Sequence, residues 1–175
     1  MGTAVISLIC MALLVFAGMT MSNDFISSWD STTDTFSDMS DGHLEVLQTD
    51  IATLSATVDV GRENLEVALI NRGGTTIADF EQWDVIVQYY DNQGNYYTTW
   101  LPYVSGTPVN NQWTVEGIYV DAGTETAELL EAGILNPGEE MIIWANISPN
   151  AGTKTTNLVI IDTPSGVTAS IHFQS

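Results

Sequence analysis

The amino-acid sequence predicts an α+β protein in which a long, apolar N-terminal helix precedes an all-β, antiparallel sandwich. Two observations support this prediction. Residues 4–21 form a stretch of eighteen positions without a charged side chain. From Gln48 onward, the chain changes to short runs in which apolar and polar residues alternate, separated by turn residues. The predicted boundaries are residues 1–42 for the helical segment and residues 48–175 for the β domain.

The composition is strongly acidic. The 175 residues include 22 Asp and Glu against 3 Lys and Arg, which gives a formal net charge of −19. Hydrophobic residues make up 45% of the chain, so this acid excess does not predict disorder. So large an excess of negative charge excludes nucleic acids and anionic lipid headgroups as partners. It favours a soluble, self-repelling surface, explained either by salt-rich surroundings or by a plainly solvated acidic face.

The apolar stretch admits three interpretations. A helix of this length would span roughly 27 Å, enough for a bilayer core. A cleaved signal peptide and a permanent anchor both normally carry basic residues near the apolar stretch, yet the first Lys or Arg is Arg62. The third interpretation is a pilin-type segment whose basic leader has been removed. Such a segment lies in the membrane before assembly and then packs against copies of itself, and it explains the missing charges.

The pilin-type interpretation assigns a polymerisation core to large apolar side chains in this stretch, with small residues between them for close helix packing. The core residues are Val5, Ile6, Leu8, Ile9, Leu13, Leu14 and Phe16. After Met21, apolar residues recur at three- or four-residue steps, and no Pro or Gly interrupts before Gly42. We therefore expect one helix to about residue 40, with a Ser/Thr-rich linker over residues 27–35 as the alternative. The apolar stripe of its second half consists of Phe25, Trp29, Phe36 and Met39.

The β domain is predicted to contain about eight strands, with the spacing of an antiparallel sandwich. The runs are residues 51–60, 65–70, 83–90, 95–101, 112–120, 140–147, 156–162 and 167–173. Residues 125–133 are predicted to form a helical turn. The single cysteine, Cys10, lies in the apolar stretch and cannot form an internal disulfide. The predicted head is therefore immunoglobulin-like in architecture, without the disulfide of antibody domains.

The sequence does not predict an enzyme. His43 and His172 lie far apart in the sequence, and no CxxC, HExxH, GxSxG or phosphate-binding glycine motif is present. The acidic residues lack the pattern of a dedicated calcium loop. We therefore expect no catalytic, cofactor-binding or metal site. One N-glycosylation sequon, Asn146-Ile147-Ser148, makes Asn146 a candidate for modification.

Three parts of the sequence resemble archaellins, the structural proteins of the archaeal swimming filament. The first is the uncharged apolar N-terminus. The second is LEVALINRGGTTIADFEQWDVIV, residues 65–87, which has the family's strand, turn, strand and "DF…WDV" order. The third is the pair ILNPGEEMIIW and IIDTPSGVTASIHF, residues 134–144 and 160–173, with an "NPGE" turn and a "TPxGVxAS" closing hairpin. Val5 departs from the glutamate that bacterial type IV pilins carry at the fifth mature position.

The resemblance implies a structural subunit of an extracellular helical filament, the archaellum, which assembles through its N-terminal helix. The implied partners are copies of the same chain, an archaellum or pilus assembly platform, and the inner membrane before assembly. Two alternatives remain open at this point. One is a subunit of an adhesive archaeal type IV-like pilus. The other is a membrane-anchored, pilin-like stator or binding protein of the archaellum, whose β domain grips the cell envelope.

Overall fold

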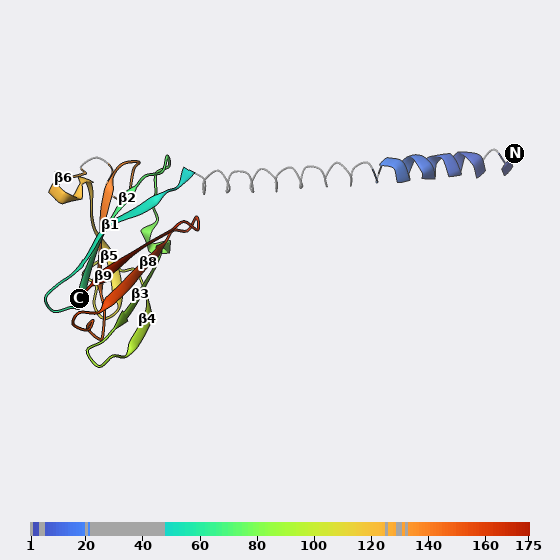
Figure 1. The fold of residues 1–175 in the computed structure, drawn as a ribbon. Helices are drawn as coiled ribbons and strands as arrows, with labels where there is room; N and C mark the ends of the chain where they lie inside the picture. Colours follow the sequence, from blue (N-terminus) through green and yellow to red (C-terminus); the bar gives the residue numbers. More distant parts are fainter. Residues whose placement is uncertain are drawn as a thin grey trace. The chain divides into compact units, whose positions relative to one another are not determined.

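The computed structural model describes residues 2–3, 6–19, 21, 48–124, 126–128, 131 and 133–175. The chain divides into two compact units, Met1–Leu44 and Glu45–Ser175. Figure 1 shows the helix of the first unit and the sheets of the second unit. Each unit is described by itself.

The first unit contains a helix over residues 6–19. Leu, Met and Ala dominate this segment and are good helix formers. The predicted fold class, with a long apolar helix as its α part, is wrong, because this described helix is short and the other regular elements are mainly strands. An absence of Pro and Gly permits a long helix but does not stabilise one. The predicted continuation over residues 22–42 lies outside the described residues.

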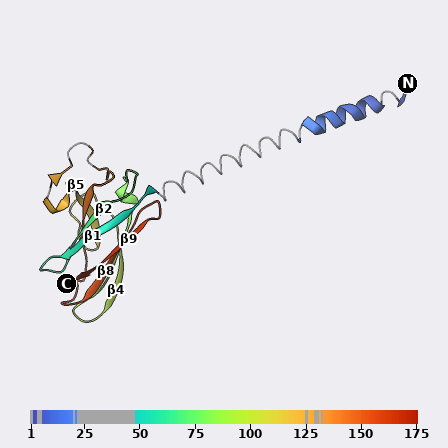
Figure 2. The same cartoon turned by 45° about the horizontal axis from the view of Figure 1, so that its top comes forward.

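The second unit is a sandwich of two antiparallel sheets (Figure 1, Figure 2). One sheet has the strand order β1-β2-β7-β5-β6, and the other has the order β4-β3-β8-β9. The strands are β1 Ile51–Val58, β2 Asn64–Asn71, β3 Asp84–Tyr90, β4 Tyr96–Leu101, β5 Gln112–Asp121, β6 Thr126–Ala127, β7 Glu140–Asn146, β8 Thr156–Asp162 and β9 Thr168–Gln174. Two short 3-10 helices are η1 Phe80–Gln82 and η2 Ala122–Thr124. The β-sandwich predicted for the head is confirmed.

The predicted strands match the observed ones closely, apart from β6. This two-residue strand lies inside residues 125–133, which were predicted to form a helical turn, and it pairs with β5. Two residues are too few to show an alternating pattern, so this strand could not be recognised from the sequence.

Alternation of apolar side chains builds the core of the sandwich. In β2, Leu65, Val67 and Leu69 point inward and are fully buried, while the residues between them face outward. The central strands β3, β7 and β8 follow the same pattern. The largest fully buried side chains of the core are Trp83, Trp113 and Tyr89.

The two lateral sides of the sandwich differ. On one side, β1 and β9 lie together, and the Thr53 hydroxyl donates a 3.1 Å hydrogen bond to the Ser170 carbonyl oxygen. On the other side, β4 is an edge strand that pairs with β3. The outer face of β3 and β4 is therefore at the open edge of its sheet.

The turn after β2 holds the residues that precede β1. The Gly74 amide donates a 2.7 Å hydrogen bond to the Gln48 carbonyl oxygen. The Arg72 and Gly73 amides donate to the Asp50 carbonyl oxygen, over 2.8 and 3.0 Å. We call these three hydrogen bonds the β1 clamp. They fix the point at which the chain enters the sandwich.

Candidate functional site

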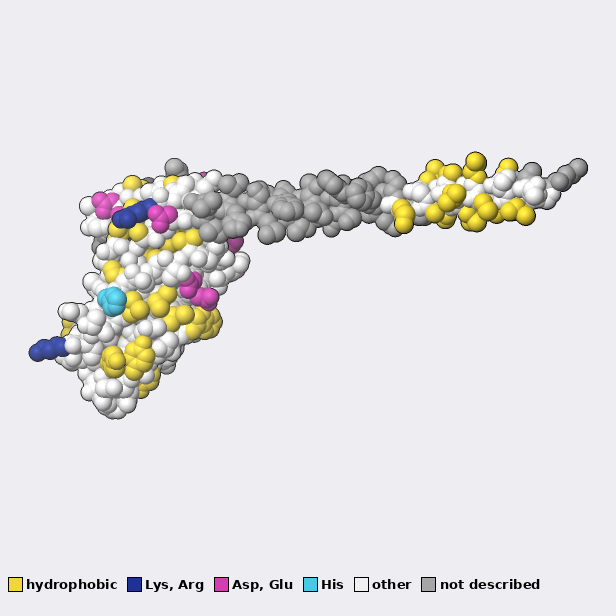
Figure 3. All heavy atoms as spheres, turned by 45° about the vertical axis from the view of Figure 1, so that its right-hand side comes forward, with side chains coloured by type: hydrophobic (Ala, Val, Ile, Leu, Met, Phe, Trp, Pro, Cys, Tyr) yellow, Lys and Arg dark blue, Asp and Glu magenta, His cyan; other side chains and the backbone are white. Residues whose placement is uncertain are grey.

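The predicted polymerisation core lies on the helix of the first unit. Its large side chains are exposed, from 52% at Ile9 to 75% at Leu14. Figure 3 shows hydrophobic side chains along this helix. The exposed members of the predicted core are Ile6, Leu8, Ile9, Leu13, Leu14 and Phe16, whereas Val5 lies outside the described residues. Burying each large side chain in lipid or protein would contribute about 1.5–3 kcal/mol of favourable free energy. Transfer of this helix to an apolar environment is therefore strongly favourable.

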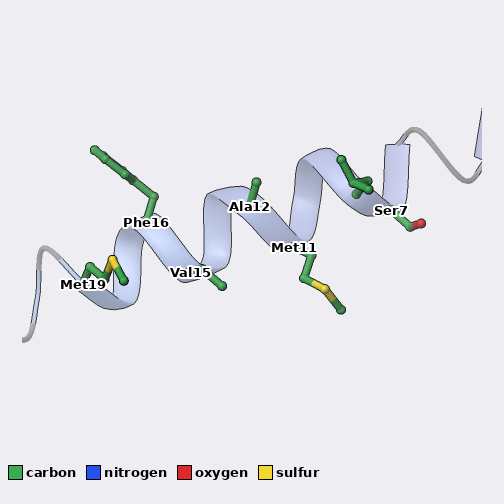
Figure 4. A pocket seen from close by; sticks show the side chains of 7 residues that line it. Ser7, Met11, Ala12, Val15, Phe16 and Met19 are labelled. Carbon is green, nitrogen blue, oxygen red and sulfur yellow. The ribbon is translucent and has the colours of Figure 1, made fainter.

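A hollow of about 600 Å³ lies along the same helix, between Ser7 and Met19. Figure 4 shows that its lining side chains, among them Met11, Val15 and Phe16, all project from one helix. A binding pocket needs walls from more than one direction to bury a ligand. The hollow is therefore a gap between side chains of an exposed helix and not a ligand site.

None of the described helices is both long enough and apolar enough to span a membrane.

The predicted helix-to-head stripe, made of Phe25, Trp29, Phe36 and Met39, lies outside the described residues, as does His43.

Asn146, the candidate glycosylation site, ends β7 in the middle of the five-stranded sheet. It is half-buried, and its side-chain amide donates a 3.0 Å hydrogen bond to the Asn64 side-chain oxygen. Attaching a glycan would replace one proton of that amide nitrogen. Modification of Asn146 stays a prediction, and an intact-mass measurement on the protein from its source cells checks it.

Two aspartates organise tight turns in the same way. The Asp91 carboxylate accepts hydrogen bonds from the Gln93 and Asn95 amides and from the Asn95 side chain. The Asn95 side-chain hydrogen bond is the main cause that lowers the pKa of Asp91. Asp59 accepts the corresponding hydrogen bonds in the turn between β1 and β2. Both carboxylates therefore stabilise turns.

The described part of the chain offers no group of three or more His, Cys, Asp and Glu side chains that could hold a metal ion. Burial raises the pKa of Tyr89 to about 12, so this core hydroxyl stays neutral at physiological pH. His172 is exposed on β9.

The outer face of β3 and β4 carries a group of exposed aromatic rings that the sequence analysis did not single out. Tyr90, Tyr96 and Trp100 are 44%, 53% and 55% exposed. Tyr90 and Tyr96 pair across the two strands, with ring centroids 5.0 Å apart. We call the outward side chains of β3 and β4 the aromatic face. The signal for it was the alternation in the run NYYTTWL, whose outward positions are aromatic or hydroxylated.

Hydrogen bonds hold two rings of the aromatic face in place. The Trp100 indole nitrogen donates a 2.7 Å hydrogen bond to an Asp84 carboxylate oxygen. The Tyr96 hydroxyl donates a 2.9 Å hydrogen bond to the Gln88 side-chain oxygen. Because both acceptors lie on β3, the two strands fix the ring positions together.

A hollow of about 560 Å³ continues from the aromatic face at the end of β4. Trp100 forms one wall, and Trp83, Tyr103 and Glu81 contribute others. Trp83 itself is almost fully buried, with 2% of its surface exposed. Aromatic walls with one carboxylate make this hollow a concave extension of the aromatic face.

Comparison with protein families identifies one match. The family described as conserved flagellar protein F, immunoglobulin-like domain, matches residues 47–170. This range covers the sandwich from β1 into β9. No curated protein sequence matches the chain.

Several solved structures share the fold at low sequence identity. The archaeal flagellum of Methanospirillum hungatei strain JF1 has a TM-score of 0.60 and 12% identity, covering 96% of this chain and 90% of that chain. Archaeal flagellin FlaB1 from Methanocaldococcus jannaschii has a TM-score of 0.52 and 14% identity, covering 73% and 90%. The archaellum periplasmic stator protein FlaG from Sulfolobus acidocaldarius has a TM-score of 0.50 and 22% identity, covering 71% and 99%. At these identities the similarity shows a common fold.

Proposed function

Because the chain belongs to the archaellum-related family of conserved flagellar protein F with an immunoglobulin-like domain, we propose that it is a stator-type binding protein of the archaellum. In this proposal its β-sandwich holds a fixed component of the cell envelope, at the cell surface or in the periplasm. The family match over residues 47–170 is the observation that carries the archaellum part of the proposal, and the fold shared with the periplasmic stator protein FlaG supports its stator-type part. The sequence resemblance to archaellins agrees with the archaellum, but the matched family favours the stator-type role over the filament-subunit role.

The exposed apolar helix has a direct use in this role. A stator must be held in place against the moving part, and exposed apolar side chains at residues 6–19 favour burial in lipid or in another protein. The acidic surface keeps the β domain in water and away from anionic headgroups. In this role the chain is a non-enzymatic connector: its apolar helix is buried in lipid or protein, and its β domain binds a component of the cell envelope.

A filament subunit is the second candidate. It is supported by the similarity to the Methanospirillum hungatei flagellum, which extends over 96% of this chain, well beyond the β domain. In that case, the exposed residues Leu8, Leu13 and Leu14 would pack against other copies of the chain. The two roles predict very different amounts of the protein in the filament.

Filaments sheared from the source cells separate the two candidates. We expect quantitative mass spectrometry to find this chain mainly in the membrane fraction, at far fewer copies than the dominant filament subunit. If this chain is itself the dominant subunit of the sheared filaments, the stator proposal is wrong and the filament role replaces it. A filament protein known to be present serves as the control for complete shearing.

A further inference from the structure

We propose that the aromatic face of β3 and β4 is a binding site for neutral sugar chains. The proposal stands on the geometry of this sheet face and does not depend on the stator role. Its ligand class follows from three properties of the face, namely exposed rings, hydrogen-bonding groups between them, and two strands that contain no Lys or Arg.

The exposed rings provide two stacking platforms. One face of a sugar ring consists largely of C–H groups, which pack favourably on the electron-rich face of an aromatic ring. Tyr90 and Tyr96 form a platform at one end of β4, and Trp100 forms another at the other end. Trp100 lies four residue steps along the strand from Tyr96, or roughly 13 Å. Two platforms at this separation suit an extended oligosaccharide better than a single monosaccharide.

The side chains between the platforms supply hydrogen bonds. Gln88 and Thr98 face each other across β3 and β4, and Asp84 lies beside Trp100. An amide, a hydroxyl and a carboxylate together offer the donors and acceptors that sugar hydroxyl groups require. The aliphatic members of the same sheet face, Ile86, Leu158 and Ile160, are only half exposed. Rings and polar groups therefore dominate the accessible part of this face.

Charge narrows the choice of ligand. None of the three cationic residues of the chain, Arg62, Arg72 and Lys154, belongs to β3 or β4, and only Lys154 lies in a loop that borders the Tyr90 end of these strands, where the Gly152 amide donates to the Tyr90 carbonyl oxygen. Anionic polymers would meet Asp84 and Glu81 without compensation, and a second copy of the chain would bring another net charge of −19. A neutral glycan is not repelled by these carboxylates.

The rings are already held in their binding positions. The hydrogen bonds from Trp100 to Asp84 and from Tyr96 to Gln88 restrict both side chains before any ligand arrives. Preorganised side chains lose less conformational entropy on binding. The hollow of about 560 Å³ behind Trp100 offers room for a terminal or branching sugar next to Tyr103 and Glu81.

Binding to defined neutral oligosaccharides tests the proposal. The probes are maltoheptaose, cellohexaose and mannopentaose, together with neutral glycans released from the envelope of the source cells. The full chain is kept in a detergent without a sugar headgroup, because glycosidic detergents would compete. We expect at least one probe to bind and to change the tryptophan fluorescence, with an affinity that stays constant between low and high salt.

Variants show whether the aromatic face is responsible. Trp100→Ala should weaken binding about tenfold, the scale expected for loss of one stacking contact. Tyr96→Ala should weaken it similarly and remains informative if the first variant is unstable. Trp144→Ala is the matched control, because this half-buried tryptophan lies on the outer face of the other sheet. It should leave binding unchanged, and thermal unfolding confirms that each variant is folded.

Three results would overturn the proposal. One is that no probe binds the wild-type chain. Another is that a probe binds equally well to the wild type, Trp100→Ala and Tyr96→Ala. If the wild type binds envelope fragments that lose this binding after protease treatment but keep it after glycan removal, the face binds protein and the sugar assignment is wrong.

Discussion

Asn71, at the buried end of β2, donates a 3.0 Å hydrogen bond from its side-chain amide to the carbonyl oxygen of Leu135. The same amide donates to the Thr75 carbonyl oxygen over 2.8 Å, and the Asn71 side-chain oxygen accepts from the Gly73 amide. One fully buried side chain thus joins two loops that are 64 residues apart in sequence.

Asn71→Ala should destabilise the β domain by about 2–3 kcal/mol, because it removes three hydrogen bonds that a fully buried side chain makes. Urea-induced unfolding followed by tryptophan fluorescence measures the loss. Asn150→Ala is the control, since the exposed Asn150 side chain makes a single hydrogen bond, to the Gly61 carbonyl oxygen. Equal losses in the two variants would contradict the role assigned to Asn71.

Gly73→Ala should destabilise the domain by about 1–3 kcal/mol, because there is no room for its methyl group. A β-carbon at Gly73 would press against the Gln48 carbonyl oxygen and stand 2.6 Å from the Asp50 amide nitrogen, both of them backbone atoms. At Gly74, a β-carbon meets nothing within 4 Å, so Gly74→Ala is the matched control. Thermal unfolding of the two variants should rank Gly73→Ala clearly below Gly74→Ala.

Acid should weaken the turn between β3 and β4. The hydrogen bonds to Asp91, first of all from the Asn95 side chain, lower its pKa below the ordinary value of 3.8. A lowered folded-state pKa contributes stability above the unfolded-state pKa, and this contribution is lost as the pH falls through the folded-state pKa. Asn95→Ala removes the main cause of the shift. It should therefore move part of the acid-induced loss of stability to higher pH, as measured by unfolding between pH 2 and 6. A curve that keeps the wild-type shape would exclude Asp91 as a source of the acid dependence.

Salt should stabilise the protein. A net charge of −19 repels itself within one chain, and screening shortens the reach of that repulsion from about 30 Å at 0.01 M to about 3 Å at 1 M salt. We expect the melting temperature to rise between these NaCl concentrations. Repeating the series with KCl at equal ionic strength separates screening from ion-specific effects. A melting temperature independent of salt would mean that repulsion costs the folded state little.

A charge on the exposed helix should release the chain from its apolar environment. Leu13→Asp places a carboxylate among side chains that are exposed in the isolated chain, and burial of that carboxylate in lipid or protein is costly. We expect this variant to shift from the membrane fraction to the soluble fraction of source cells. Leu13→Met, which keeps the apolar character, is the control and should behave like the wild type. An unchanged distribution of Leu13→Asp would show that residues 6–19 do not hold the protein in place.

The strands were predictable because each core strand of the sandwich alternates buried and outward-facing residues, a pattern that is visible in the local sequence. Leu65, Val67 and Leu69 alternate with outward residues, and the same period marks β3, β7 and β8. The position of β7 between β2 and β5 could not be predicted from a local pattern, because strand pairing depends on contacts between segments that are distant in sequence. The described helix at residues 6–19 is shorter than the predicted one, since an uncharged sequence without helix breakers allows a helix but does not determine its length.

The aromatic face was harder to recognise from sequence for a related reason. Tyr96 and Trp100 look like core residues in a strand pattern, and their outward direction became clear only from the register with β3. Tyr90 and Tyr96 are five residues apart across a turn, and only the antiparallel pairing brings their rings together. A one-residue shift in register would have buried these rings and exposed Tyr89 and Tyr97 instead.

The β1 clamp has a mechanical consequence. Any pull on the N-terminal side of the β domain reaches the sandwich through Gln48 and Asp50, whose carbonyl oxygens accept hydrogen bonds from residues 72–74. Tension directed along β1 would load these hydrogen bonds and the β1–β2 ladder in shear, so that many bonds share the force. Tension across the strand would instead open them one after another. A protein that resists torque through this connection would therefore be strong in one direction of loading and weak in the other.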